Sequence, residues 1–508
     1  KEEEKKADKP AAKDSTAKKT SIQIDEAYLS ERIQQLGPSL GNQVGPYVIQ
    51  SGEKTTLLFA STHDEGKANL WKLVLEPFER PKTEMIQGAA GFGFEISTAK
   101  NQYYLLIGGN ISTLNIETNK TETIAMDYTF RKKLSAEFEQ MFFEAWANIE
   151  QNFYDEKFHG KDWKGIRDRY ATFLPHLNIR SDLRQVLAEM LGELNASHTG
   201  FTSSGTEEEI FYKGRSAGTG IIFANDDPYR VERIVPRSPA DRMDKDIRPG
   251  DRLVKVNATA VVPRNNREQY LIQPSLDEEI SLTFLRGQEE RTVKIHPAST
   301  FAINDLLYDE WEAGCQKRVD EMGKNKIAYV HMKDMTGNSL DHFLKQMVSE
   351  GWQRDALILD LRYNTGGNVH DKVLQFLSQK PYLQWKYREG QLSPQPNFTP
   401  GAKPIVLLVN EPSLSDAEMT TEGFKRLKLG TVVGTETYRW IIFTSGKGLV
   451  DGSFYRLPSW GCYSLDGGDL EVTGVKPDVY VKNTFKDRLE NKDPQLDKAI
   501  ELILGKMR

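Results

Sequence analysis

The chain has 508 residues, of which 38% are hydrophobic and 28% are charged. This length exceeds what one hydrophobic core supports, so several domains are expected. The formal net charge of −6 argues against general nucleic-acid binding, and no apolar run approaches the roughly 20 residues of a membrane-spanning helix. The two cysteines, Cys315 and Cys462, form no CxxC pair, so no zinc or redox motif is present.

The N-terminal part divides into a charged segment and a β-rich segment. Residues 1–20 mix charges at low hydrophobicity, which predicts a disordered linker. They contain no initiator methionine and no signal-peptide core, so we expect a piece of a longer polypeptide. Residues 21–128 alternate apolar and polar residues in short runs such as PYVIQSGEKTTLLFAST. This spacing predicts about two blades from the end of a β-propeller, with a small β-sandwich as the alternative.

The middle of the chain changes its period twice. In residues 129–204 apolar residues recur at helical spacing, which predicts a helical subdomain that ends in NASHTGF. Residues 205–298 place short strands around the Gly-rich GTGIIF, followed by a predicted helix start at SPADR and a turn into a strand at IRPGDRLVKVN. This order resembles a PDZ domain, which holds a peptide carboxylate on backbone N–H groups. A small β-rich domain without a ligand is the alternative.

Residues 299–508 alternate strands with helices. KIAYVHM, ALILDLR and PIVLLVN are short apolar runs typical of strands buried between helices. SLDHFLKQMVSEG and NVHDKVLQFLSQ are amphipathic, and DPQLDKAIELILGKMR predicts a closing helix. The segment is therefore predicted to be an α/β domain.

A candidate nucleophile lies in NEPSLSDAEM, residues 410–419. Ser415 and Asp416 stand where a buried strand passes into a helix N-terminus, whose N–H groups would stabilise a negative oxygen. Serine is also a preferred N-cap, so Ser415 is either a cap or a nucleophile on these grounds alone. Gly366 and Gly367 in DLRYNTGGN follow another buried strand and would either expose backbone N–H groups to a ligand or form a turn.

A nucleophilic serine needs a base, usually histidine. Of the eight histidines, His198 differs because ASHTGF places it between a helix and a loop, beside small residues. The other seven, His370 among them, have no distinctive neighbours and are predicted to be surface or packed side chains. Glu471 precedes the turn in DLEVTGVKPD, but it is one of 73 acidic residues and composition does not select it.

Taken in chain order, these pieces resemble the tricorn protease group within the family of tail-specific (C-terminal processing) serine peptidases. The resemblance covers nearly the whole chain and rests most on SHT, DLRYNTGGN, NEPSLSDAE, DGSFYRLPSWGCYSLDG and GVKPD. It implies a multidomain α+β fold with a propeller end, a helical subdomain that carries the base, a PDZ domain and a crotonase-like α/β catalytic core.

The resemblance also implies the residues of the site. A Ser-His-Ser-Glu tetrad would consist of Ser415 as nucleophile, His198 as base, Ser197 as the link, and Glu471 as acid. Asp416 and Gly367, in preference to Gly366, would supply the N–H groups of the oxyanion hole. Two features depart from the relatives. Ala417 replaces a glycine, and a glycine-rich loop is replaced by three larger residues that we expect to contact substrate, Tyr438, Arg439 and Trp440.

The function implied is that of a serine endopeptidase or oligopeptidase that cleaves peptides or unfolded segments through an acyl-enzyme, with no metal or other cofactor. By the same resemblance it would be a homo-oligomer, hexameric in relatives, in the cytoplasm, with no nucleic-acid or membrane partner. Export is the alternative location. The alternative function is a non-catalytic peptide-binding scaffold that uses the PDZ and propeller surfaces. A crotonase-type acyl-CoA enzyme has little support, because it has no use for the SHT and SDAE motifs.

Overall fold

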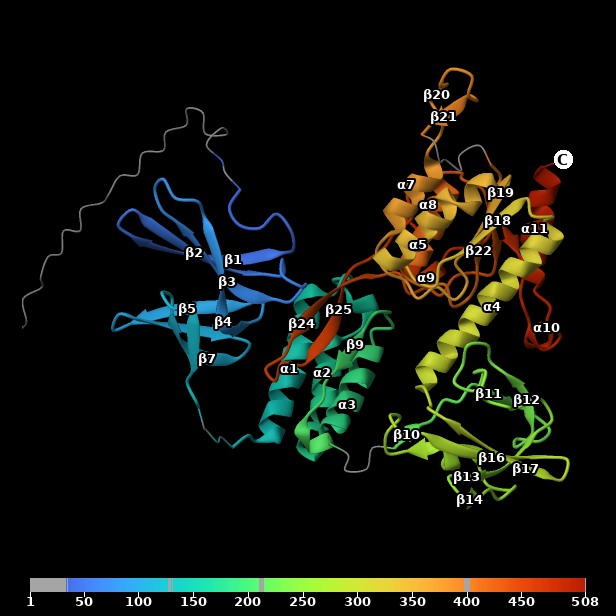
Figure 1. Cartoon of the computed structure of the whole chain (residues 1–508), viewed down its shortest axis with the longest axis horizontal. Helices are drawn as coiled ribbons and strands as arrows, with labels where there is room; N and C mark the ends of the chain where they lie inside the picture. The colour runs from blue at the N-terminus through green and yellow to red at the C-terminus, as the bar shows by residue number, and fades with distance from the viewer. Residues whose placement is uncertain are drawn as a thin grey trace, which may run out of the picture. The chain divides into compact units, whose positions relative to one another are not determined.

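The computed structural model describes residues 33, 35–126, 129, 131–209, 214–396 and 403–507 (Figure 1). The linker predicted for residues 1–20 lies outside them. The chain forms two compact units that divide between Arg131 and Lys132. Within the described residues, no helix has both the length and the apolar character needed to cross a membrane.

The first unit consists of two antiparallel four-stranded meanders. The first meander contains β1 (Gln43–Ser51), β2 (Lys54–Ser61), β3 (Asn69–Leu75) and β4 (Lys82–Ala90). The second contains β5 (Phe94–Ala99), β6 (Gln102–Ile107), β7 (Asn110–Asn115) and β8 (Lys120–Thr123). Successive strands pair within each meander, and β4 pairs with β8 between them. Four-stranded meanders are the units of propeller blades. The assignment of these two to a propeller stays a prediction.

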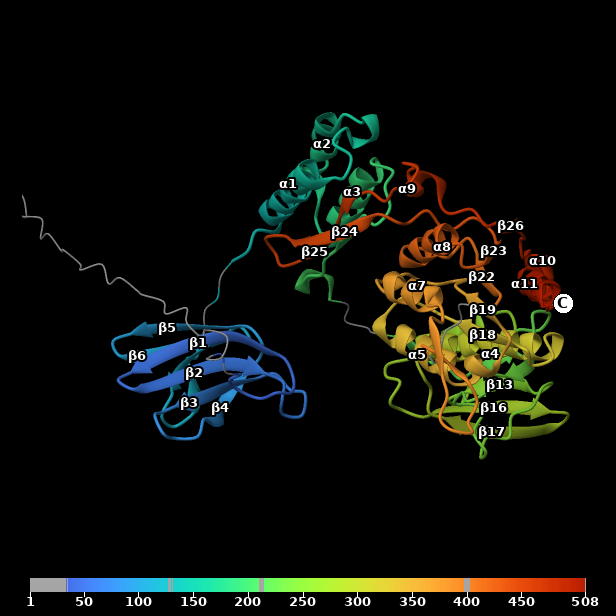
Figure 2. The same cartoon turned by 90° about the horizontal axis from the view of Figure 1, so that it is seen from above.

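The second unit begins with the predicted helical subdomain. Its helices are α1 (Leu134–Asn152), α2 (Trp163–Ala171) and α3 (Arg180–Gly192). The short strand β9 (Gly200–Thr202) follows and pairs with β25 (Phe454–Trp460), which in turn pairs with β24 (Phe443–Gly448). The hairpin of β24 and β25 lies beside the three helices (Figure 2), and its Leu449, Tyr455 and Leu457 join their buried core. A distant part of the chain thus completes the helical subdomain and brings the segments before β9 and after β25 together.

Residues 214–298 form small antiparallel sheets. The strands are β10 (Arg215–Ser216), β11 (Ile221–Phe223), β12 (Val231–Ile234), β13 (Arg252–Val256), β14 (Thr259–Ala260), β15 (Ile272–Gln273), β16 (Ile280–Arg286) and β17 (Glu289–Ile295). The prediction of a helix start at SPADR is wrong, because these residues form turns. The Ala240 N–H donates to Thr219 O of a neighbouring loop, so the local backbone bonds do not build a helical ladder. The PDZ assignment stays a prediction.

The rest of the chain is the predicted α/β domain. Its five-stranded sheet is parallel, in the order β18 (Ile327–His331), β19 (Ala356–Asp360), β22 (Ile405–Val409), β23 (Thr431–Gly434) and β26 (Val479–Tyr480). The main helices are α4 (Thr300–Met322), α5 (Gly337–Val348), α7 (His370–Ser378), α8 (Asp416–Arg426) and α11 (Pro494–Lys506). Short elements complete it: α6 (Glu350–Gln353), β20 (Leu383–Trp385), β21 (Ser393–Gln395), α9 (Leu470–Thr473) and α10 (Phe485–Leu489).

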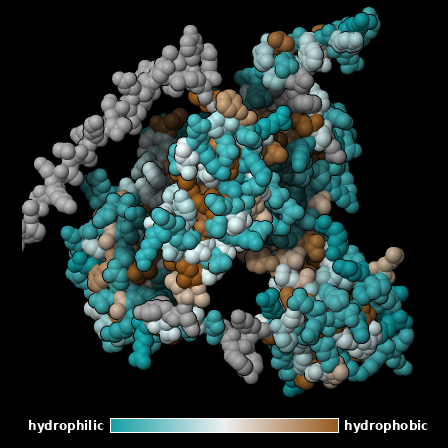
Figure 3. Space-filling model, turned by 60° about the vertical axis from the view of Figure 1, so that its left-hand side comes forward, coloured by the Kyte–Doolittle hydropathy of each residue, from teal (hydrophilic) through white to brown (hydrophobic). Residues whose placement is uncertain are grey.

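Helices cover both faces of this sheet. Leu357 and Leu359 pack against α5, α7 and α8, whereas Ile358 between them packs against α4 and α11. This alternation follows from the period of two in a strand and explains why the strands are apolar throughout. Hydrophilic residues predominate on the face of the molecule drawn in Figure 3.

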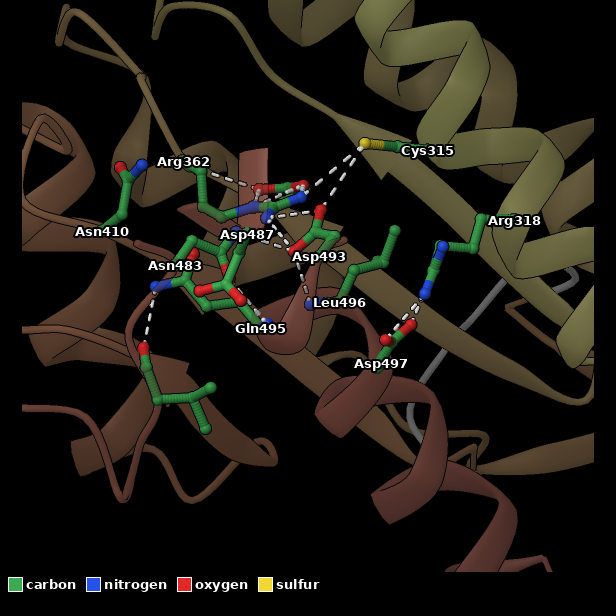
Figure 4. A network of polar contacts seen from close by, with 12 residues as sticks. Cys315, Arg318, Arg362, Asn410, Asn483, Asp487, Asp493, Gln495, Leu496 and Asp497 are labelled. Atoms are coloured by element: carbon green, nitrogen blue, oxygen red, sulfur yellow. Dashed lines mark hydrogen bonds and ion pairs between the residues drawn. The ribbon is translucent and has the colours of Figure 1, made fainter. Parts of the chain in front are cut away.

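A buried ionic network fixes the end of β19. The Arg362 guanidinium, 1% exposed, bonds to Asp360 at 2.7 Å and to both oxygens of Asp493 at 2.8 Å (Figure 4). Asp493 also accepts the backbone N–H of Leu496 at the start of α11. The network therefore ties β19, and the glycine-containing loop that follows it, to the C-terminal helix.

Candidate functional site

Ser415 lies at a sharp turn between β22 and α8. Its backbone has φ 56° and ψ −117°, a conformation that is unfavourable for a residue with a Cβ. Ser413, which is fully buried, anchors the turn by donating its hydroxyl to Leu361 O at 2.8 Å. Among the described residues no hydrogen bond to Ser415 Oγ is found, and the Glu418 N–H donates to the Ser415 carbonyl instead. The hydroxyl is therefore not used as a helix cap.

The carboxylate of Glu418, which is fully buried, organises this turn. One oxygen accepts the backbone N–H of Ser415 at 3.0 Å and that of Trp440 at 2.8 Å. The other accepts the Thr437 hydroxyl at 2.6 Å and the Arg439 N–H at 2.9 Å. Burial raises the pKa of Glu418, while these four donors oppose the shift. Glu418 thus fastens segment 437–440 to the turn that carries Ser415.

The two glycines lie against this turn. A Cβ added to Gly366 would come within 2.7 Å of Ser415 Cβ, and φ at Gly366 is +79°. Its N–H donates to Asn364 Oδ1 at 2.8 Å. In the part of the chain that the structure describes, the N–H groups of Gly367 and Asp416 have no recorded acceptor. Gly367 and Asp416 are therefore the two candidates still able to donate to an oxyanion, whereas Gly366 provides the space beside Ser415.

On the sequence-based expectation that Ser415 is a peptidase nucleophile, we predict that Gly366→Ala lowers kcat/KM for peptide hydrolysis by about 10²–10³-fold, the loss typical of a damaged oxyanion hole. The new methyl group would displace Ser415, and the positive φ would be strained. Gly314→Ala in α4 is the matched control, because an added Cβ there meets no atom within 4 Å. Steady-state kinetics on a fluorogenic peptide measure both variants. Equal activities would show that Gly366 has no role beside the serine.

Ser197, His198 and Glu471 form a second cluster. Glu471 accepts the Ser197 N–H at 2.6 Å on one carboxylate oxygen and the Ser197 hydroxyl at 3.0 Å on the other. Ser197 Oγ in turn lies 3.3 Å from His198 Nδ1. The imidazole is 5% exposed, and this burial, together with the charge of Arg456, lowers the pKa of His198 to about 3. The pairing of β9 with β25 brings together the segment with Ser197 and His198, which precedes β9, and the segment with Glu471, which follows β25.

One segment joins the two clusters. The Trp440 N–H bonds to Glu418 on the serine side, and the next N–H, that of Ile441, bonds to Glu471 at 3.1 Å. The Trp440 ring also lies edge-on to the His198 imidazole, with centroids 5.2 Å apart. No hydrogen bond between His198 and Ser415 occurs among the described residues. Trp440 instead contacts the His198 ring and bonds through its N–H to Glu418, which also accepts the Ser415 N–H.

Of the expected substrate contacts, Tyr438 and Arg439 are exposed and Trp440 is half-buried. The Tyr438 ring is tilted against Trp440, with centroids 5.4 Å apart, and the Arg439 guanidinium pairs with Glu436. Within the described structure the Trp440 indole N–H is buried without a hydrogen-bond partner. The backbone of this segment is thus fastened through Glu418 to the turn with Ser415, while the side chains of Tyr438 and Arg439 are exposed.

Sequence reasoning missed two residues at this site. Glu418 had a signal, because a glutamate three residues after a serine is the capping-box spacing. His370 was predicted to be a surface or packed histidine; it is half-buried, and its Nδ1 lies 2.5 Å from Asp416 Oδ1, a partner that was not predicted. No local pattern marks that contact, because 46 residues separate the pair.

The comparisons with known proteins agree with this geometry. Residues 326–481 match the model of peptidase family S41, and residues 134–192 match the tricorn protease C1 domain. The matched residues 326–481 include the parallel sheet and the strained turn with Ser415, so this core is similar to that of family S41 peptidases. The chain is thus similar to tricorn-like members of this family, which confirms the resemblance found in the sequence.

Individual relatives extend over most of the chain. The tricorn protease of Thermoplasma acidophilum is 28% identical over 424 residues, which are 77% of this chain and 36% of that protein. Tricorn protease homolog 1 of Streptomyces coelicolor is 29% identical over 388 residues, 73% of this chain and 35% of that protein. The crystal structure of the tricorn protease superposes with a TM-score of 0.72 at 25% identity, covering 91% of this chain and 46% of that one. The chain thus spans about a third of the length of these two curated relatives.

Proposed function

We propose that this chain is the catalytic portion of a serine peptidase that forms an acyl-enzyme on Ser415. The observation that carries the proposal is the pair of consecutive N–H groups of Trp440 and Ile441. One binds the carboxylate that holds the Ser415 turn, and the other binds the acid of the Ser197–His198 cluster. A serine on a strained strand-to-helix turn and a histidine oriented through a hydroxyl by a carboxylate are the parts that acyl transfer requires.

The roles follow from the hydrogen bonds. The Ser197 hydroxyl donates to Glu471, so its oxygen accepts from His198 Nδ1 and leaves Nε2 as the basic nitrogen. Nε2 would take the proton of Ser415 as the serine attacks the scissile carbonyl, and would return it to the leaving amine. The free N–H groups of Asp416 and Gly367 would receive the oxyanion. Water would then release the acyl group.

The proposed substrates are peptides or unfolded polypeptide segments. The exposed side chains of Tyr438 and Arg439 support a role in binding, because Glu418 fastens their segment to the turn that carries Ser415. By analogy with tricorn-like relatives, the strands of 214–298 would act as a PDZ domain and the meanders of the first unit as propeller blades. A homo-oligomer in the cytoplasm is part of the same proposal.

Active-site labelling tests this function directly. A fluorophosphonate should modify the wild-type protein on Ser415, and mass spectrometry of the labelled peptide identifies the residue. Ser415→Ala should not be labelled, whereas Ser349→Ala, which changes an exposed serine in the same domain, should be labelled normally. Absence of labelling and of peptide hydrolysis in the wild-type protein would favour the peptide-binding scaffold instead.

We also predict an unusually acidic limb in the pH profile of kcat/KM. The base acts when neutral, and burial and the Arg456 charge lower its pKa to about 3. Activity should therefore persist as the pH falls through 6.5, the ordinary value for histidine, and decline only in more acidic solution. Arg456→Gln removes the positive charge that disfavours the imidazolium, so its acid limb should shift to higher pH. A limb near pH 6.5 that does not respond to Arg456→Gln would contradict the assignment of His198.

A further inference from the structure

The contact between His370 and Asp416 links the two halves of the candidate oxyanion hole. Asp416, at the N-terminus of α8, is 1% exposed, and its backbone N–H is one candidate donor. Its side chain turns away to α7, where one oxygen accepts the N–H groups of Val369 at 2.7 Å and His370 at 2.9 Å. The other oxygen meets His370 Nδ1 at 2.5 Å. Because α7 directly follows the loop with Gly367, the second candidate donor, this carboxylate joins both donor segments.

A buried carboxylate at this place creates an electrostatic problem. A negative charge beside an oxyanion hole repels the oxyanion that the hole must stabilise, most strongly where water is excluded. Hydrogen bonds from two backbone N–H groups orient the carboxylate but add no net charge. A protonated His370 would cancel it. Among the described residues, the charged groups that face His370 are Asp416 from α8 and Asp371 from α7, the latter at 3.5 Å and almost fully exposed. Both favour the imidazolium.

We propose that His370 is a positioning residue for the oxyanion hole. Its imidazolium holds the Asp416 carboxylate, fixes the α8 N-terminus relative to the loop with Gly367, and neutralises the charge next to the developing oxyanion. The proposal rests on the peptidase function proposed above and adds to it a group outside the tetrad. The hydrogen bond to Asp416 raises the pKa of His370, with burial opposing it, so the imidazolium persists above the ordinary histidine range.

Two substitutions at this position separate the effect of the Nδ1 hydrogen bond from the effect of the positive charge. His370→Ala removes both, and kcat should fall about 10–100-fold while KM changes less than about threefold, because the loss concerns the transition state. His370→Asn keeps an N–H close to the position of Nδ1 but carries no charge, so it should recover only part of kcat, to the level that the wild type reaches on the alkaline side. Gln375→Ala is the matched control on the same helix, since its side chain is exposed and carries no charge. Its kcat should equal that of the wild type.

The pH profile provides a signature that a merely structural role would not give. A raised pKa means that His370 loses its proton as the pH rises above 6.5, so kcat of the wild type should decline on the alkaline side. His370→Asn cannot titrate and should lack this alkaline limb. Unchanged kcat in His370→Ala, or an alkaline limb that persists in His370→Asn, overturns the positioning role while leaving the peptidase assignment intact. A wild-type protein with no hydrolysis and no labelling of Ser415 overturns both.

Discussion

Replacement of Ser415 by alanine is expected to lower kcat for peptide hydrolysis by about 10⁴–10⁶-fold, the loss seen when a serine nucleophile is removed. The residual rate would come from binding and the oxyanion hole alone. The same variant should unfold at nearly the wild-type temperature. Ser415 Oγ makes no helix-capping bond to any residue that the structure describes, so its removal forfeits none of the roughly 1 kcal/mol that an N-cap contributes. Kinetics with a fluorogenic peptide and thermal unfolding by circular dichroism measure the two effects.

The combination of these two measurements decides between the two interpretations of the serine. A nucleophile predicts a large kinetic effect and a small effect on stability, whereas a cap predicts the reverse. Ser413→Ala is the informative comparison in the same turn, because its buried hydroxyl bonds to Leu361 O and to the Asn410 N–H. That variant should lose stability and remain able to be labelled at Ser415. Turnover retained by Ser415→Ala would remove the basis of the peptidase proposal.

The sequence predicted the buried strands of the core well, because their signal is local. KIAYVHM, ALILDLR and PIVLLVN became β18, β19 and β22, which are buried on both faces. The helix start expected at SPADR failed, since Ala240 donates its N–H to a loop that no local pattern could indicate. The pairing of β9 with β25 was likewise not predicted, although it assembles the histidine cluster from segments about 250 residues apart.

The residues of the candidate site likewise divide into those with a local signal in the sequence and those without one. Ser415 and the glycines stand at strand ends, where position along the chain suggests a role. Glu471 could be selected only by resemblance, because one acid among many has no signal until the fold brings it to Ser197. The partnership of His370 with Asp416 depends on the packing of α7 on α8, so its sequence neighbours say nothing about it. Residues that act through tertiary contacts are those that sequence reasoning misses.

The second large effect concerns stability. Arg362→Met is expected to lower the free energy of unfolding by about 3–5 kcal/mol, the cost of leaving buried charges without their partner. The methionine fills much of the space, but Asp360, which is 0% exposed, and Asp493 would then repel each other in a medium of low dielectric. Activity should fall as well, since Tyr363 begins the loop that leads to Gly366. Urea unfolding monitored by tryptophan fluorescence measures the change, with Trp311 over the Arg362 guanidinium as a local reporter.

Arg318→Met is the matched control for this experiment, because it breaks an ion pair of similar geometry in a different environment. Arg318 binds both oxygens of Asp497 at 2.6 and 2.7 Å, and both side chains are about one-third exposed (Figure 4). Water can solvate the charge that remains, so this variant should cost only about 0–1 kcal/mol. Burial, rather than bond length, thus determines how much unfolding free energy each of the two substitutions costs. Equal shifts of the unfolding midpoint would mean that the Arg362 network relaxes or takes up water, and that it does not hold the end of β19 in place.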